Sequence, residues 1–206
     1  MTPVAILCAS PRSVYHGMGH VDVFDRNRDA RTFVGGMPIV AHPPCRGWSS
    51  KCRHQAKPEP GEMGLGIWCA EQVRQWGGVL EQPAHSHLWH AAGLPNPGRG
   101  EPHSWSVEVW QAWWGYPMRK ATWLYFSRIS PKAVQYPFRL HPKGGDRRAE
   151  QVMSKQQRSA TTPEFAAWLV AMARKVWECR VVEVELSGVA IGPSATTQHP
   201  IYEGQV

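Results

Sequence analysis

The chain has 206 residues, of which 42% are hydrophobic and 19% charged. This balance is typical of a globular domain large enough to bury a core, and it excludes disordered and collagen-like chains. No run of about 18 apolar residues occurs, which argues against a transmembrane helix. The start lacks the basic region of a signal peptide. Five scattered cysteines favour reduced thiols over a disulfide framework, so we expect a cytoplasmic protein.

The formal net charge of +7 is concentrated in one segment. Between Arg119 and Arg158, ten Lys or Arg residues accompany two acidic residues, and the rest of the chain is close to neutral. We interpret residues 119–160 as a basic loop region around one strand, which favours a polyanionic partner such as DNA. A basic surface exposed only to solvent is the alternative.

The first half of the chain predicts strands that alternate with turns or helices. Strands are predicted at Val4–Cys8, Val21–Asp25, Ile39–Ala41 and from Val79 into Glu81-Gln82-Pro83. A helix is predicted to begin near Pro58–Glu62 and to end at Gly77-Gly78. The order strand, helix, strand predicts a βαβ unit with two parallel strands.

The second half predicts an extended segment at Ser104–Trp114 and a strand at Thr122–Phe126. Thr162 and Pro163 are typical of the first residues of a helix. Cys179–Leu186 is predicted as a further strand. We therefore expect a single α/β domain over residues 1–186 and a flexible tail over 187–206.

Cys45 and Glu81 are the residues most suggestive of chemistry. The sequence His42-Pro43-Pro44 ends a strand and holds Cys45 on a stiff turn. The βαβ unit would place Cys45 and Glu81 at the carboxyl ends of neighbouring parallel strands, where ligands bind in α/β proteins. A thiolate can add to C6 of a pyrimidine while a carboxyl group hydrogen-bonds a ring nitrogen, which activates C5. A buried structural cysteine and an ion-paired glutamate are the alternatives.

Three basic residues close to Cys45 in sequence bear on the reactivity of its thiol. They are His42, Arg46 and Lys51. Because positive neighbours favour a thiolate, we expect them to lower the pKa of Cys45.

Three short motifs occur in the order seen in a known enzyme family. Pro43-Pro44-Cys45, Glu81-Gln82-Pro83 and Gly115–Thr122 together resemble the motifs of the cytosine-5 DNA methyltransferases. Thr162-Pro163-Glu164 is similar to a late segment of that family. The resemblance implies that Cys45 is the nucleophile and that Glu81 contacts the target base. It also implies DNA as the partner.

The same resemblance implies roles for the residues around these motifs. Lys120 would be a further catalytic residue, and the substrate-binding residues would be Pro44, Arg46, Gln82 and Arg119. Arg46 and Gln82 replace the Gln and Asn of the family motifs, and Met118 replaces a Gln.

The resemblance further implies S-adenosylmethionine as cofactor and a reduced Rossmann-like methyltransferase fold, with a mostly parallel sheet and flanking helices. Asp25, after the second predicted strand, would bind a ribose hydroxyl of the cofactor. Leu7–Arg12 stands where the family has a glycine loop, and only 44 residues precede Cys45. We therefore expect a shortened cofactor half, and the residues support base activation more directly than methyl transfer.

Three other functions remain open from the sequence. A DNA-binding protein derived from a methylase would not need Cys45, and a nucleotide-level enzyme similar to thymidylate synthases would use the same thiolate chemistry. Cys52-x-His54 and His85-x-His87-x-x-His90 could supply zinc ligands, although their spacing matches no standard zinc motif. We expect no metal site.

Overall fold

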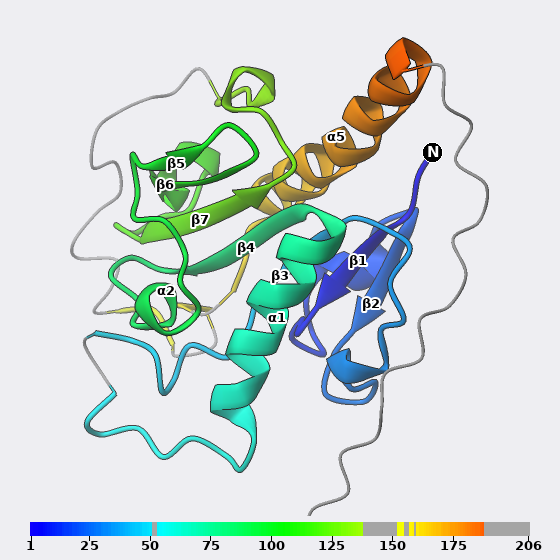
Figure 1. Ribbon diagram of the computed structural model, residues 1–206. Coiled ribbons are helices and arrows are strands. Elements are labelled where there is room, and N and C mark those ends of the chain that lie inside the picture. Colours follow the sequence, from blue (N-terminus) through cyan, green and yellow to red (C-terminus); the bar gives the residue numbers. More distant parts are fainter. Residues whose placement is uncertain (51–52, 138–151, 155–156, 159, 188–206) are drawn as a thin grey trace, which may run out of the picture.

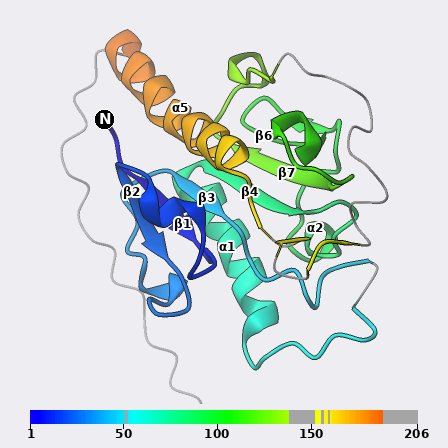
Figure 2. The ribbon, with the colours of Figure 1, turned by 180° about the vertical axis from the view of Figure 1, so that it is seen from behind.

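A computed structural model describes residues 1–50, 53–137, 152–154, 157–158 and 160–187. Its described residues form a seven-stranded sheet in the order β2-β1-β3-β4-β7-β6-β5, with helix α1 on one face and helix α5 on the other (Figures 1 and 2). The strands are β1 (Val4–Leu7), β2 (Val21–Phe24), β3 (Ile39–Ala41), β4 (Gly78–Pro83), β5 (Gly100–Glu101), β6 (Ser104–Trp110) and β7 (Ala121–Ser127). The α-helices are α1 (Glu62–Trp76), α2 (Leu88–Ala91) and α5 (Pro163–Ser187). The 3₁₀ turns are η1 (Val14–Gly17), η2 (Ala30–Thr32), η3 (Gln111–Trp114) and η4 (Pro131–Ala133).

Strands β2, β1, β3 and β4 are parallel neighbours, as the βαβ prediction requires for β3 and β4. The two inner strands β1 and β3 are buried on both faces, which explains their continuous apolar sequences, whereas the edge strand β2 is only partly buried. In β1, Val4 and Ile6 belong to the core under α5, whereas Ala5 and Leu7 belong to the core under α1. The α/β class predicted from the sequence is confirmed.

Strands β7, β6 and β5 are antiparallel to their neighbours. The sheet is therefore mixed, and the prediction of a mostly parallel sheet holds for only half of the strand pairings. The connection between β6 and β7 explains the difference. It consists of η3 and a turn at Gly115–Lys120, which is shorter than the dozen or so residues that a parallel crossover needs.

The helices begin near the predicted residues, but one ends much later. Helix α1 ends before Gly77, and the hydroxyl of Thr162 accepts a hydrogen bond from Phe165 N (3.3 Å) at the start of α5. The predicted strand at Cys179–Leu186 is wrong, because α5 continues through Ser187. No Gly or Pro follows Pro163 until Gly188, so nothing in the sequence interrupts the helix. The tail 188–206 and most of the basic segment, residues 138–151, lie outside the described residues.

The connections after β1 and β2 are short. Only the turns η1 and η2 stand between β1, β2 and β3. Strand order reverses at β1, which has β2 on one side and β3 on the other. In α/β sheets this switch point leaves an open crevice at the carboxyl ends of the strands. Within the described chain, no helix has the length and apolar character needed to cross a membrane.

Candidate functional site

Polar side chains meet at the carboxyl ends of β1, β3 and β4. The register pairs Ala41 of β3 with Leu80 of β4, so His42 follows β3 next to Glu81. The backbone N–H of His42 donates a hydrogen bond to Leu7 O of β1 (2.9 Å), which fixes the backbone of His42 at the end of β3. His42 and Glu81 lie on the α5 side of the sheet, because side chains alternate along β3 and β4.

Both carboxylate oxygens of Glu81 have hydrogen-bond partners. His42 Nδ1 lies 3.1 Å from Glu81 Oε2, and the other ring nitrogen, Nε2, lies 2.8 Å from the hydroxyl of Tyr15 in η1. Gln111 Nε2 donates to Glu81 Oε1 (3.1 Å) and to the Thr122 hydroxyl (3.0 Å). A continuous chain of polar contacts therefore runs from η1 across β3 and β4 to β7.

The surroundings of Glu81 favour its ionised form. Burial alone would raise the pKa of this carboxyl group. The hydrogen bond and charge of His42, the charge of Lys120 and the hydrogen bond from Gln111 outweigh burial and hold the pKa below its usual value. Glu81 is therefore a carboxylate near neutral pH.

Cys45 lies in the loop after β3 and is exposed to solvent. Its carbonyl accepts hydrogen bonds from Trp48 N (3.1 Å) and Ser49 N (2.8 Å), which form a tight turn behind the thiol. Desolvation by the surrounding protein, followed by the charge of Glu81, raises the pKa of Cys45, and Lys120 opposes this shift.

The predicted lowering of the Cys45 pKa by its sequence neighbours is therefore wrong. The guanidinium of Arg46 points to other partners, because it donates to Lys57 O (3.3 Å) and lies 3.8 Å from Glu62 Oε1. Lys51 lies outside the described residues. The positive charge that favours the thiolate comes instead from Lys120.

Lys120 connects the predicted catalytic residues. It stands just before β7, where its Nζ donates to Ala160 O (3.1 Å) and lies 4.8 Å from the ring centre of Tyr116. Burial lowers the pKa of Lys120, while the charges of Glu81 and Cys45 raise it. The charges of Glu81 and Lys120 both act on the Cys45 thiol, and the charges of Glu81 and Cys45 both act on Lys120, so the three predicted catalytic residues lie near one another.

The four predicted substrate-binding residues lie in different environments. Gln82 is buried on the α1 side of the sheet, where its amide donates to Pro43 O and accepts from the Ser86 hydroxyl (3.2 Å). It therefore holds the proline turn in place. Arg119 is exposed beside Lys120, whereas Pro44 and Arg46 line a cavity.

This cavity has a volume of about 460 Å³ and lies beyond the ends of β1 and β2, at the start of α1. Asp25 is part of its wall. One Asp25 oxygen accepts hydrogen bonds from the N–H groups of Asn27 (2.7 Å) and Arg28 (3.2 Å), and the other lies 3.3 Å from His16 Nε2. The predicted ribose-binding carboxylate is thus already engaged by its own loop.

Glu62, which also lines this cavity, differs in the hydrogen bonding of its two carboxylate oxygens. Its Oε2 accepts from Glu59 N (2.7 Å), just before α1, whereas Oε1 is buried without a hydrogen-bond partner among the described residues. Only the more distant guanidinium of Arg46 compensates this oxygen. A ligand with an amine or other cationic group would satisfy it.

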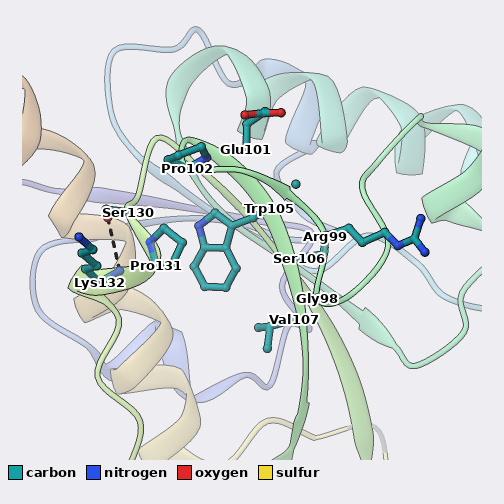
Figure 3. A pocket seen from close by; sticks show the side chains of 11 residues that line it. Gly98, Arg99, Glu101, Pro102, Trp105, Ser106, Val107, Ser130, Pro131 and Lys132 are labelled. Atoms are coloured by element: carbon teal, nitrogen blue, oxygen red, sulfur yellow. Dashed lines mark hydrogen bonds between the residues drawn. The ribbon is translucent and has the colours of Figure 1, made fainter.

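A second cavity of about 430 Å³ lies beside β5 and the first half of β6 (Figure 3). Trp105, Pro102 and Pro131 line it, and none of the predicted site residues does. No group of three or more His, Cys, Asp or Glu side chains in the described part of the chain could hold a metal ion. Cys52, half of one suggested zinc motif, lies outside that part.

The sequence did not indicate the roles of Tyr15, His42 and Gln111 in holding Glu81. For His42 a signal existed, because an ungapped parallel register between β3 and β4 places it beside Glu81. Tyr15 lies in η1 and Gln111 is the first residue of η3, and no local pattern points to them.

Comparison with known proteins gave no match for this chain among protein-family models, curated proteins or solved structures. The resemblance to cytosine-5 DNA methyltransferases therefore rests on the short sequence motifs alone.

Proposed function

We propose that this protein acts on a pyrimidine base, most directly cytosine in DNA, by adding the Cys45 thiolate to C6 of the ring. The observation that carries the proposal is the position of Glu81 beside His42 at the ends of β4 and β3, with the charges of Glu81 and Lys120 both acting on the Cys45 thiol. These residues come from three separate motifs, and they are the ones that pyrimidine activation needs.

The addition step assigns a role to each residue. The Cys45 thiol loses its proton to solvent, and its sulfur forms a bond to C6. The electron pair of the C5–C6 double bond then moves into the ring, where N3 accepts a proton through the carboxyl group of Glu81. C5 becomes nucleophilic and can bond an electrophile, and loss of the C5 proton then expels the thiolate. Lys120 favours the thiolate through its charge.

A reduced Rossmann-like methyltransferase fold belongs to the same proposal. The reversal of strand order at β1 and the open carboxyl ends of the strands support it. The contact between two motif segments supports it further, because the Thr162 hydroxyl donates to Trp114 O (3.1 Å) beside the Gly115–Thr122 motif.

S-adenosylmethionine is the cofactor that this proposal implies, and the cavity beside Cys45 fits it in charge. Glu62 would hold its amino group, and Pro44 and Arg46, the neighbours of Cys45 in sequence, line the same cavity. Asp25 is not assigned to the ribose, because its own loop and His16 already engage its carboxylate. The cofactor would supply a methyl group to C5. Calorimetry should show binding that Glu62→Gln weakens at least fivefold. An absence of binding at millimolar cofactor would contradict methyl transfer.

Hydrogen exchange at C5 tests base activation without any cofactor. The protein is incubated in D₂O with randomised cytosine-containing duplexes and single strands, or with dCMP and dUMP. The digested nucleosides are then weighed by mass spectrometry. We expect deuterium at C5 of cytosine in DNA with wild type and none with Cys45→Ser. Exchange restricted to dCMP or dUMP would indicate a nucleotide-level enzyme. No exchange in any substrate, or exchange that persists in Cys45→Ser, would contradict the proposal.

A further inference from the structure

We propose that His42 supplies the proton that Glu81 passes to the pyrimidine ring, with Tyr15 holding the imidazole in place. This inference rests on the proposed function and assigns His42 as a positioning and proton-donating residue that acts through Glu81. It follows from the order of contacts from Tyr15 to His42 and from His42 to Glu81.

The need for a second proton donor arises from Glu81 itself. An acid that protonates N3 must carry a proton when the thiolate attacks, but the surroundings of Glu81 keep it ionised. Its Oε1 is occupied by the amide of Gln111, which has no proton to release. The group on Oε2 is His42 Nδ1, at 3.1 Å, and imidazole is the side chain best suited to exchange a proton near neutral pH.

The imidazole is held so that only one of its nitrogens can serve Glu81. Nε2 lies 2.8 Å from the Tyr15 hydroxyl, and Tyr15 is almost completely buried. The side chains of His42 and Glu81 are each only 13% exposed, so solvent has limited access to the proton between them. Burial, followed by the charge of Glu81, raises the pKa of Tyr15, which keeps this hydroxyl neutral. Tyr15 thus orients the ring and does not replace His42 as the donor.

The proton balance is simple. The proposed cycle starts with a proton on each ring nitrogen of His42 and with an ionised Glu81. As sulfur bonds to C6, the Nδ1 proton moves to Glu81 and from there to N3, which leaves neutral His42, ionised Glu81 and a neutral ring adduct. The reverse transfers restore the pair when the thiolate leaves. The charged groups that face this pair are Lys120 from the turn before β7 and Cys45 from the loop after β3.

The first test measures C5 exchange against pH in wild type, His42→Gln and Tyr15→Phe, with His103→Gln as control. His103 is an exposed histidine next to β6, at the end of the sheet away from Glu81. For wild type we expect a bell-shaped profile, because exchange needs both an ionised Cys45 and a protonated His42. Glutamine can still donate a hydrogen bond but cannot release a proton. His42→Gln should therefore lose the falling limb at high pH and be at least about tenfold slower near neutral pH.

Tyr15→Phe should keep the bell shape at a reduced rate, and His103→Gln should match wild type. A purely structural role for His42 would lower the whole profile without changing its shape. An unchanged His42→Gln profile, within twofold of wild type, overturns the role of His42 while leaving the proposed function in place. Absence of exchange in wild type overturns both.

The second test needs no substrate and separates a folding defect from a lost proton. Nitrogen-15 NMR of the histidine rings in wild type should show a proton on Nδ1 of His42, with a signal that changes in Glu81→Gln and stays the same in His103→Gln. A His42 ring that carries its proton only on Nε2 overturns the proposal, whatever the activity.

Discussion

Desolvation raises the pKa of Cys45 and so favours the protonated thiol. The negative charge of Glu81 raises this pKa further, and the positive charge of Lys120 lowers it. A change of one pKa unit alters the thiolate fraction about tenfold below the pKa. The site therefore keeps Cys45 mostly protonated at rest. A bound substrate that neutralises or shields Glu81 would release more thiolate.

Replacing either charged neighbour should change the alkylation rate of Cys45 in opposite directions. Near neutral pH, Glu81→Gln should speed reaction with iodoacetamide about threefold, and Lys120→Met should slow it by a similar factor. Peptide mapping by mass spectrometry measures the rate at Cys45 alone. Cys69, which is fully buried and has a raised pKa, should stay unmodified in all variants. Equal rates at Cys45 in the three proteins would show that these charges do not act on the thiol.

The sequence indicated the proposed reacting residues more clearly than their neighbours in space. Cys45 was selected from the proline turn a few residues after β3, and Glu81 from its position within β4. The direction of the Cys45 pKa could not, because it depends on Lys120, which is distant in sequence. Basic residues next to Cys45 in sequence, such as Arg46, turn away from it.

Helix α1 and the loop after β3 hold Cys45 through one closely packed tryptophan. Trp48 is buried. Its backbone N–H donates a hydrogen bond to the carbonyl of Cys45 (3.1 Å), and its backbone carbonyl accepts one from His87 N (2.9 Å). Its indole lies against Gly66 of α1, where an added Cβ would come within 2.6 Å of Trp48 Nε1. Gly66 thus allows the helix to approach the loop that carries Cys45.

Two glycines of α1 should respond oppositely to alanine. Gly64→Ala should stabilise the protein by about 0.5–1 kcal/mol, because Gly64 faces open space and alanine is the better helix former. Gly66→Ala should destabilise it by about 1–3 kcal/mol through overpacking against Trp48. Urea unfolding of both variants measures the difference. A gain in stability for Gly66→Ala would contradict the close packing of α1 on this loop.

Strands and helix starts could be predicted from local patterns, but strand direction and helix length could not in every case. The parallel pair β3–β4 follows from the helix between the strands. The antiparallel half depends on the short β6–β7 connection. The long α5 was missed because its last residues, rich in Val, have a strand-like composition.

The whole molecule combines a nearly neutral body with a basic segment that begins beside the site. Arg119 is exposed next to Lys120, at the end of the sheet where Cys45 and Glu81 meet. A nucleic acid that enters this site would therefore meet positive charge as it approaches.

DNA affinity should fall steeply with salt. We expect a plot of log K against log salt with a slope steeper than about −3, and Arg119→Ala should reduce the slope by about one. Cys45→Ala should bind within twofold of wild type, because binding depends on phosphate contacts. A slope near zero would argue against DNA as the partner. A steep slope without C5 exchange would favour a DNA-binding protein that has no catalytic activity.

Covalent capture of Cys45 is the most direct test of the central claim. An oligonucleotide containing 5-fluorocytosine, offered together with S-adenosylmethionine, traps the nucleophile, because once C5 has received a methyl group it carries fluorine in place of the proton whose loss would expel the thiolate. We predict a protein–DNA adduct in wild type, resistant to denaturation, with its mass on the peptide that contains Cys45 and absent in Cys45→Ser. No adduct in wild type, or one that remains in Cys45→Ser, would contradict the account.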